Sequence, residues 1–182
     1  FGITAISINQ SPLKQNIQNT TRKPFNGFTT SLDDYIQYAP IALMYSADAF
    51  KLKAEHSVWN QTKYLFIAEV TTGGIIQLLK HSLKIERPDK SANNSFPSGH
   101  TGQAFVAAQV LHNEFKNTQP ILAYSGYLFA TSTGTLRIVN NKHWLPDVLM
   151  AASISILITN LVYHFEPLKN WNPFKTKKSD LY

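Results

Sequence analysis

Two stretches without a charged side chain, residues 121–136 and 148–163, constrain the fold more than any other feature of the sequence. Each is 16 residues long. Pro120 directly precedes the first stretch and Pro146 lies two residues before the second, and proline suits the first turn of an α-helix. Neither alternates apolar and polar residues as a half-buried strand does. Both fall just short of the roughly 17–25 residues that cross a bilayer. We interpret them as core helices of a bundle, with membrane-spanning helices as the alternative.

Helical patterns also cover the first half of the chain. The first begins after Ser31, and Pro40 should kink or split it, because proline cannot continue a helix in its interior. The second begins after Ser57 and ends before Arg87. It contains Gly73–Gly74, which cost roughly 1 kcal/mol each relative to alanine, and a close helix crossing is one explanation for them. Further helices are expected at residues 100–115, 120–137 and 146–165. The sequence therefore predicts an all-α helical bundle of about five principal helices.

The two ends of the chain differ from this pattern. Residues 1 to about 30 are polar and predict an irregular arm, followed by a helical domain over residues 31–166. Residues 167–182 mix lysines with Trp171 and Phe174, which predicts a basic aromatic tail, either resting on an anionic membrane surface or solvated. The chain begins with Phe1, so we expect a processed, exported protein or a truncated one.

Charge and composition narrow the range of partners. The formal net charge of +6 favours anionic partners, namely nucleic acid, anionic lipid or phosphorylated small molecules. The sequence has no arginine-rich run and no nucleic-acid motif, so we expect no nucleic-acid partner. It also contains no cysteine, which excludes disulfides, thiolate catalysis and thiolate metal sites.

Three short polar clusters interrupt the apolar segments between residues 80 and 147. In the first, Lys80, Lys84 and Arg87 share one face of a helix near its C-terminal end. They either form a solvated basic end that complements the helix dipole or face an anion. The pair Arg87–Pro88 favours an anion site, because a guanidinium fixed outside a helix end presents a planar fork to two phosphate oxygens.

The second cluster is the run Pro97–Ser98–Gly99–His100, directly before an apolar helix. Ser98 supplies a hydroxyl group, and Gly99 lets a ligand approach the backbone N–H closely. The amides of a helix's first turn favour anions, which would put His100 at the rim of an anion site. The alternative is an ordinary serine N-cap followed by a surface histidine.

The third cluster consists of Arg137, His143 and Asp147. A histidine and an aspartate four residues apart can face each other across one helical turn. The carboxylate then fixes the tautomer and leaves the other ring nitrogen free to attack. One alternative is a structural His–Asp cap. Another is a metal site made by His100, His143 and Asp147, which the neighbouring cations disfavour by repelling a divalent ion.

The three clusters, in this order, resemble the type 2 phosphatidic acid phosphatase superfamily, which includes bacterial acid phosphatases and vanadium haloperoxidases. The family pattern is Lys, six residues, Arg-Pro; then Pro-Ser-Gly-His; then Ser-Arg, five residues, His, three residues, Asp. The match extends over about 68 residues, from Lys80 to Asp147. One departure is Leu136, which stands where the family has serine. We expect it to weaken ligand orientation or alter substrate choice.

The resemblance implies a role for each matching residue. His143 would be the nucleophile that forms a phosphohistidine, Asp147 would orient it, and His100 would protonate the leaving oxygen and then activate water. The different neighbours of the two histidines should split their pKa values and give a bell-shaped pH profile. No metal and no cofactor are implied. The residues that would bind the phosphoryl oxygens are Lys80, Arg87, Ser98, Gly99 and Arg137.

These observations predict a metal-independent phosphatase that acts outside the cytoplasm on a phosphorylated substrate. A lipid phosphate or an isoprenoid diphosphate is expected first, and a soluble phosphomonoester second. The modest hydrophobicity favours a soluble or membrane-peripheral enzyme, with an integral membrane protein as the alternative. Two other functions remain open. One is a vanadate-dependent haloperoxidase, for which the chain is short. The other is a non-catalytic module that binds phosphate or a lipid headgroup, supported only by Leu136.

Overall fold

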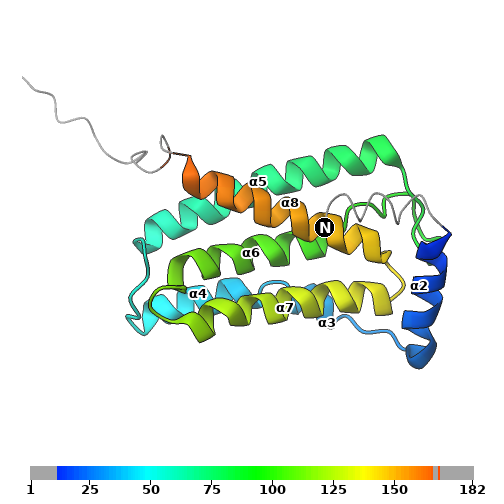
Figure 1. Cartoon of the computed structure of the whole chain (residues 1–182), viewed down its shortest axis with the longest axis horizontal. Helices are drawn as coiled ribbons and strands as arrows, with labels where there is room; N and C mark the ends of the chain where they lie inside the picture. Colours follow the sequence, from blue (N-terminus) through cyan, green and yellow to red (C-terminus); the bar gives the residue numbers. More distant parts are fainter. Residues whose placement is uncertain (1–11, 166–167, 169–182) are drawn as a thin grey trace, which may run out of the picture.

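The computed structural model describes residues 12–165 and residue 168, so most of the expected basic aromatic tail lies outside the described residues. Within these ranges every regular element is a helix, which confirms the all-α bundle (Figure 1). The α-helices are α2 (Leu13–Arg22), α3 (Leu32–Ile36), α4 (Ala39–Ala49), α5 (Val58–Leu83), α6 (Gly99–Phe115), α7 (Pro120–Val139) and α8 (Leu145–His164), and a 3-10 turn, η1 (Lys23–Phe25), follows α2.

Helix α6 lies at the centre of the bundle. It contacts α4, α5, α7 and α8, and these long helices run along the long axis of the molecule in Figure 1. Of its 17 residues 11 are buried, most of them small or aliphatic, so the helix is enclosed by its neighbours on most sides. Among its fully buried residues are Ala104, Val106, Ala107, Ala108, Val110 and Leu111. A central helix of this kind holds its N-terminal turn, which contains Gly99 and His100, in a fixed place.

Close helix crossings occur at glycines other than the expected pair. A Cβ atom added at Gly126 on α7 would lie 3.1 Å from Cα of Ala108 on α6. One added at Gly134 would lie 2.7 Å from Cγ1 of Val148 on α8. At Gly73 and Gly74, by contrast, none of the described atoms lies within 4 Å of such a Cβ, so the predicted close crossing there is wrong.

Proline sets two of the helix boundaries as predicted. Pro40 falls in the first turn of α4 and separates this helix from the short α3, which confirms the expected split. Helix α5 begins after Ser57 and ends at Leu83, before Arg87 as expected. Lys84 then takes a left-handed conformation with φ of 47° and turns the chain into the loop that carries Arg87.

The expectation of an irregular arm is wrong for residues 13–22, which form α2. The buried residue of this helix is a glutamine, whereas its two large apolar residues, Leu13 and Ile17, are not buried. The side-chain amide of Gln18 donates hydrogen bonds to the carbonyl oxygen of Ile138 (3.1 Å) and to Oδ1 of Asn141 (2.9 Å). Side-chain hydrogen bonds to the end of α7 thus hold α2 against the bundle.

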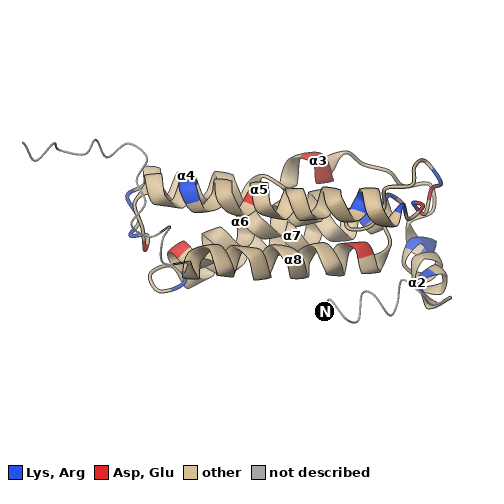
Figure 2. Cartoon of the chain, turned by 90° about the horizontal axis from the view of Figure 1, so that it is seen from above, with Lys and Arg blue, Asp and Glu red and all other residues tan. Residues whose placement is uncertain are grey.

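The outer faces of the long helices are apolar and exposed. Charged residues gather toward the ends of these helices and are sparse along their middles (Figure 2). Within the described residues, α8 is the helix that is long and apolar enough to cross a membrane, yet only 39% of its most apolar window is buried inside the bundle. The expectation of a fully buried core helix over residues 148–163 is therefore wrong. The exposed side chains include Phe66, Val70 and Leu78 on α5, Ile121 and Leu128 on α7, and Leu157 and Leu161 on α8.

Candidate active site

The three polar clusters meet at one end of the bundle, where the loop after α5 lies against the first turns of α6 and α8. The backbone N–H of Ser98 donates to the carbonyl oxygen of Asp147 (3.1 Å), which joins the second cluster to the third. The indole N–H of Trp144 donates to the carbonyl oxygen of Glu86 (2.8 Å), which joins the third cluster to the first. Through these bonds, segments that are about 50 residues apart in the sequence lie next to one another.

His143 and Asp147 form a buried pair. Nδ1 of His143 lies 3.3 Å from Oδ2 of Asp147, and both side chains are almost fully excluded from solvent. Burial lowers the pKa of His143 to about 4, against the opposing effect of Asp147. The imidazole is therefore neutral at pH 7. With the proton on Nδ1 facing the carboxylate, the lone pair is on Nε2.

Two further groups hold the Asp147 carboxylate. Its Oδ2 accepts hydrogen bonds from the backbone N–H of Trp144 (2.9 Å) and from the hydroxyl of Ser95. Ser95 is fully buried, and the sequence motifs did not single it out. Three donors on one oxygen fix the orientation of the carboxylate and, through it, that of the His143 ring.

Lys80 and Arg87 lie side by side at the end of α5. The Lys80 ammonium donates to the carbonyl oxygen of Asn94, and Nε of Arg87 donates to the side-chain oxygen of the same asparagine (2.9 Å). Burial and then the charge of Arg87 lower the pKa of Lys80 to about 8. The pKa of Arg87 is lowered by burial and by the charge of Arg137. Cations that repel one another in this way are stabilised when an anion binds between them.

Arg137 is buried and held on one side by an acidic pair from α3. Its Nη1 lies 2.7 Å from Oδ2 of Asp33 and 3.8 Å from Oδ1 of Asp34. Asp33 also accepts a hydrogen bond from the amide of Asn140 (2.8 Å). Nε of Arg137 is buried, and it has no hydrogen-bond partner within residues 12–165 and 168. Buried donors are almost always paired, so this atom is suited to an anion.

His100 also has a carboxylate partner. Its Nε2 lies 2.9 Å from Oδ1 of Asp34, and both side chains are partly exposed. Burial and Arg137 lower the pKa of His100, whereas Asp34 acts in the opposite direction. The sequence motifs did not single out Asp33 or Asp34 and missed both contacts. No local signal could have found them, because their partners lie 66 or more residues away.

Ser98 and Gly99 form the beginning of α6. The Ser98 hydroxyl oxygen accepts from the backbone N–H (3.4 Å) and the hydroxyl (2.9 Å) of Thr101, so this serine is an N-cap, as one interpretation of the sequence had it. Its own hydroxyl hydrogen remains a donor. No described atom lies within 4 Å of a Cβ placed at Gly99, which leaves room for an anion at the first amides of the helix.

The alternative metal site is not formed by the described residues. No group of three or more histidine, aspartate or glutamate side chains that could hold a metal ion occurs in the ranges 12–165 and 168. His100 pairs with Asp34, and His143 pairs with Asp147. The two histidines thus belong to two separate His–Asp pairs, and the charge of Arg137 lowers the pKa of both histidines.

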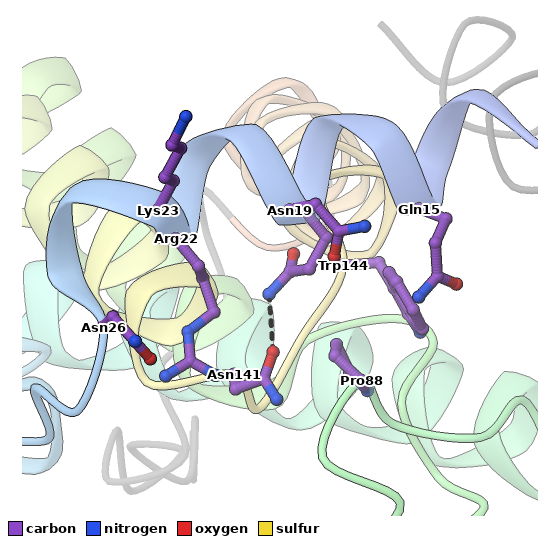
Figure 3. Close-up of a pocket in the computed structure, with 9 residues that line it drawn as sticks. Gln15, Asn19, Arg22, Lys23, Asn26, Pro88, Asn141 and Trp144 are labelled. Atoms are coloured by element: carbon purple, nitrogen blue, oxygen red, sulfur yellow. Dashed lines mark hydrogen bonds between the residues drawn. The ribbon is translucent and has the colours of Figure 1, made fainter.

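Helix α2 covers the outer side of these loops. A polar cavity of about 380 Å³ lies beneath it, and Pro88 and Trp144, the neighbours of Arg87 and His143, form part of its wall. In Figure 3 the side chain of Arg22 points from α2 toward Asn141. Helix α2 thereby braces the segments that carry two of the candidate site residues.

Comparisons with known proteins identify the family and the fold. A family model described as the PAP2 superfamily matches residues 61–171. The lipid A 1-phosphatase of Porphyromonas gingivalis is 33% identical over 167 residues, which are 91% of this chain. The chain spans only 38% of the length of that relative.

Two solved structures share the fold. The crystal structure of Aquifex aeolicus LpxE superposes with a TM-score of 0.65 at 22% identity, covering 86% of this chain and 98% of the other. A transmembrane PAP2-type phosphatidylglycerolphosphate phosphatase from Bacillus subtilis superposes with a TM-score of 0.55 at 21% identity, covering 95% and 94% of the two chains. At these identities the likeness concerns the fold alone.

Proposed function

Because this chain belongs to the PAP2 superfamily, we propose that it is a phosphatase that removes the phosphate group from a lipid phosphate through a phosphohistidine intermediate. The observation that carries the proposal is the meeting of three distant segments at one end of the bundle. They bring the cations of Lys80, Arg87 and Arg137 to two His–Asp pairs. Phosphoryl transfer requires groups of these kinds, because most of its catalysis consists of positioning the reactants and stabilising the charge of the transition state.

In the first step, Nε2 of His143 attacks the phosphorus atom and the bond to the leaving oxygen breaks. His100, in its imidazolium form, gives its proton to that oxygen, so the product leaves as a neutral alcohol. The three cations and the first amides of α6 stabilise the charge on the equatorial oxygens. Asp147 stabilises the positive charge that the His143 ring acquires, as the carboxylate does in a catalytic triad.

In the second step, His100 acts as a base. Now neutral, it takes a proton from a water molecule, whose oxygen attacks the phosphorus as the bond to His143 breaks. Inorganic phosphate leaves, and both histidines return to their starting protonation states. Asp34 supports the proton held by His100 in each half of the cycle, because a carboxylate 2.9 Å away favours the imidazolium.

The lipid nature of the substrate rests on two observations. The curated relative bears the name lipid A 1-phosphatase, and the outer faces of α5, α7 and α8 expose large apolar side chains. Exposed apolar patches of this kind suit contact with a membrane. We therefore propose a membrane-associated enzyme with its site on the extracytoplasmic side, where the lipid phosphate is presented.

Phosphate release from the purified protein in detergent tests the proposal. A lipid phosphate and a soluble aryl phosphate should both release inorganic phosphate, vanadate should inhibit, and a chelator should leave the rate unchanged. His143→Ala should lower kcat by about 10³-fold or more. His164→Ala, an exposed histidine at the far end of α8, is the matched control and should keep the wild-type rate. Full turnover by His143→Ala would remove the proposed nucleophile.

A further inference from the structure

A cavity of about 360 Å³ opens beside His100 where α5 and α6 meet the residues just before α4. Its volume is near the lower end of the range for small-ligand sites, roughly 300–1,000 Å³. Its wall includes Gln37, Glu69 and Gln103. None of the described residues that line it is a lysine or an arginine. We call it the Glu69 pocket. It adjoins the proposed acid–base histidine and lacks the cations that a phosphate group needs.

Two buried oxygens in the wall of the Glu69 pocket lack a partner. Neither Oε1 of Glu69 nor Oγ1 of Thr72 has a hydrogen-bond partner in the part of the chain that the structure describes. Thr72 is only 1% exposed. Buried polar atoms are nearly always satisfied, so these two indicate an occupant that offers hydrogen-bonding groups of its own.

The carboxyl group of Glu69 is suited to an uncharged occupant. Burial raises its pKa to about 8, so the group is predominantly protonated at pH 7 and both donates and accepts hydrogen bonds. The carboxamides of Gln77 and Gln103 add further neutral donors and acceptors to the wall. A chain of pure hydrocarbon would leave these groups unpaired at a cost of about 1–3 kcal/mol each.

Gly73 gives the Glu69 pocket part of its space. Glycine in a helix interior costs roughly 1 kcal/mol relative to alanine. Close packing does not compensate for this cost at Gly73 and Gly74, because none of the described atoms lies within 4 Å of a Cβ placed at either residue. Gly73 lines the pocket, whereas Gly74 does not. A side chain at position 73 would enter the cavity, and the same side chain at position 74 would point into open space.

We propose that the Glu69 pocket holds the leaving group of the substrate and that this group is an uncharged, hydroxylated ring, as in a sugar 1-phosphate. This inference rests on the proposed function, because His100 at the edge of the pocket is the group that protonates the leaving oxygen. Glu69, Thr72 and Gln103 hydrogen-bond the ring hydroxyls. Arg137, one of the proposed phosphate ligands, does not line the Glu69 pocket, and its charge acts on His100.

The test is a matched pair of variants, Gly73→Leu and Gly74→Leu. The substrates are an acylated hexosamine 1-phosphate and an isoprenyl phosphate of similar chain length, both in detergent. Gly73→Leu should lower kcat/KM for the hexosamine 1-phosphate by about tenfold or more and leave the inhibition constant of vanadate unchanged. Gly74→Leu should change neither value. Thermal unfolding of both variants reports whether they fold equally well.

The variant Glu69→Leu tests the hydrogen bonding in the Glu69 pocket separately from the volume of the pocket. It should reduce kcat/KM for the hexosamine 1-phosphate by about tenfold and change the value for the isoprenyl phosphate much less. Equal effects of Gly73→Leu and Gly74→Leu, or an equal loss on both substrates in Glu69→Leu, would overturn the inference. A wild-type protein that hydrolyses neither substrate nor an aryl phosphate would refute the proposed function itself.

Discussion

Replacing Asp34 by asparagine removes the carboxylate that faces His100 and keeps the size of the side chain. Oδ1 of Asp34 lies 2.9 Å from Nε2 of His100 and 3.8 Å from Nη1 of Arg137. The neighbouring Asp33 keeps its own bonds to Arg137 and Asn140, so the fold of this region should survive the change. The variant therefore removes one negative charge from beside the proposed acid–base histidine, and a comparison of two substrates separates this effect from one on Arg137.

The size of the effect follows from the exposure of the pair. Two unit charges about 4 Å apart interact by about 1 kcal/mol in water and about 4 kcal/mol at an effective dielectric constant of about 20. The side chains of His100 and Asp34 are 32% and 52% exposed, which favours the lower value. Loss of about 1 kcal/mol of this attraction lowers the pKa of His100, and it lowers the rate by about fivefold at a pH above that pKa.

The assay compares kcat/KM for an alkyl and an aryl phosphate from about pH 4 to about pH 8. Asp34 favours the imidazolium, so its loss should move the alkaline limb of the alkyl phosphate profile to lower pH. An aryl oxide leaves without needing a proton, so the aryl phosphate should be much less affected. Asp34→Glu should recover part of the loss. Equal losses on both substrates would show that Asp34 acts on the phosphate cradle or the fold instead of on His100.

Three other variants test separate parts of the structure. Ser95→Ala removes one donor from the Asp147 carboxylate and should lower kcat by about tenfold with little change in KM; an unchanged kcat would contradict the positioning role. Glu114→Gln breaks a buried cluster at the end of α6 remote from the site and should lower the free energy of unfolding by about 1–3 kcal/mol in urea titrations, with kcat retained. Gly126→Val places atoms against Ala108 and should destabilise the bundle by a similar amount; wild-type stability would refute the close crossing.

The sequence predicted the long helices well because their signals are local. Proline at the start of α7 and the Ser98 cap before α6 put the predicted boundaries within two residues of the observed ones. The motif spacing also identified groups from three segments that the fold brings to one end of the bundle. Their catalytic roles stay predictions until the variants are assayed.

Other features were beyond the reach of sequence patterns because they depend on contacts between distant segments. Asp33 and Arg137 are 104 residues apart, and nothing near either residue indicates the ion pair. Helix α2 has only two large apolar residues, Leu13 and Ile17, and amide hydrogen bonds of Gln18 help to hold it in place. The burial of a long apolar helix is also not a local property, and only 39% of the most apolar window of α8 is buried although its composition suits a core.

The most direct test of the account is the isolation of the covalent intermediate. The enzyme is mixed with a radiolabelled substrate, stopped in alkaline denaturant and digested, and the labelled peptide is identified. The account predicts a label on His143 that is stable to alkali and lost in acid, as expected for a phosphohistidine. Turnover without any labelled histidine, or a label elsewhere that survives acid, would contradict it.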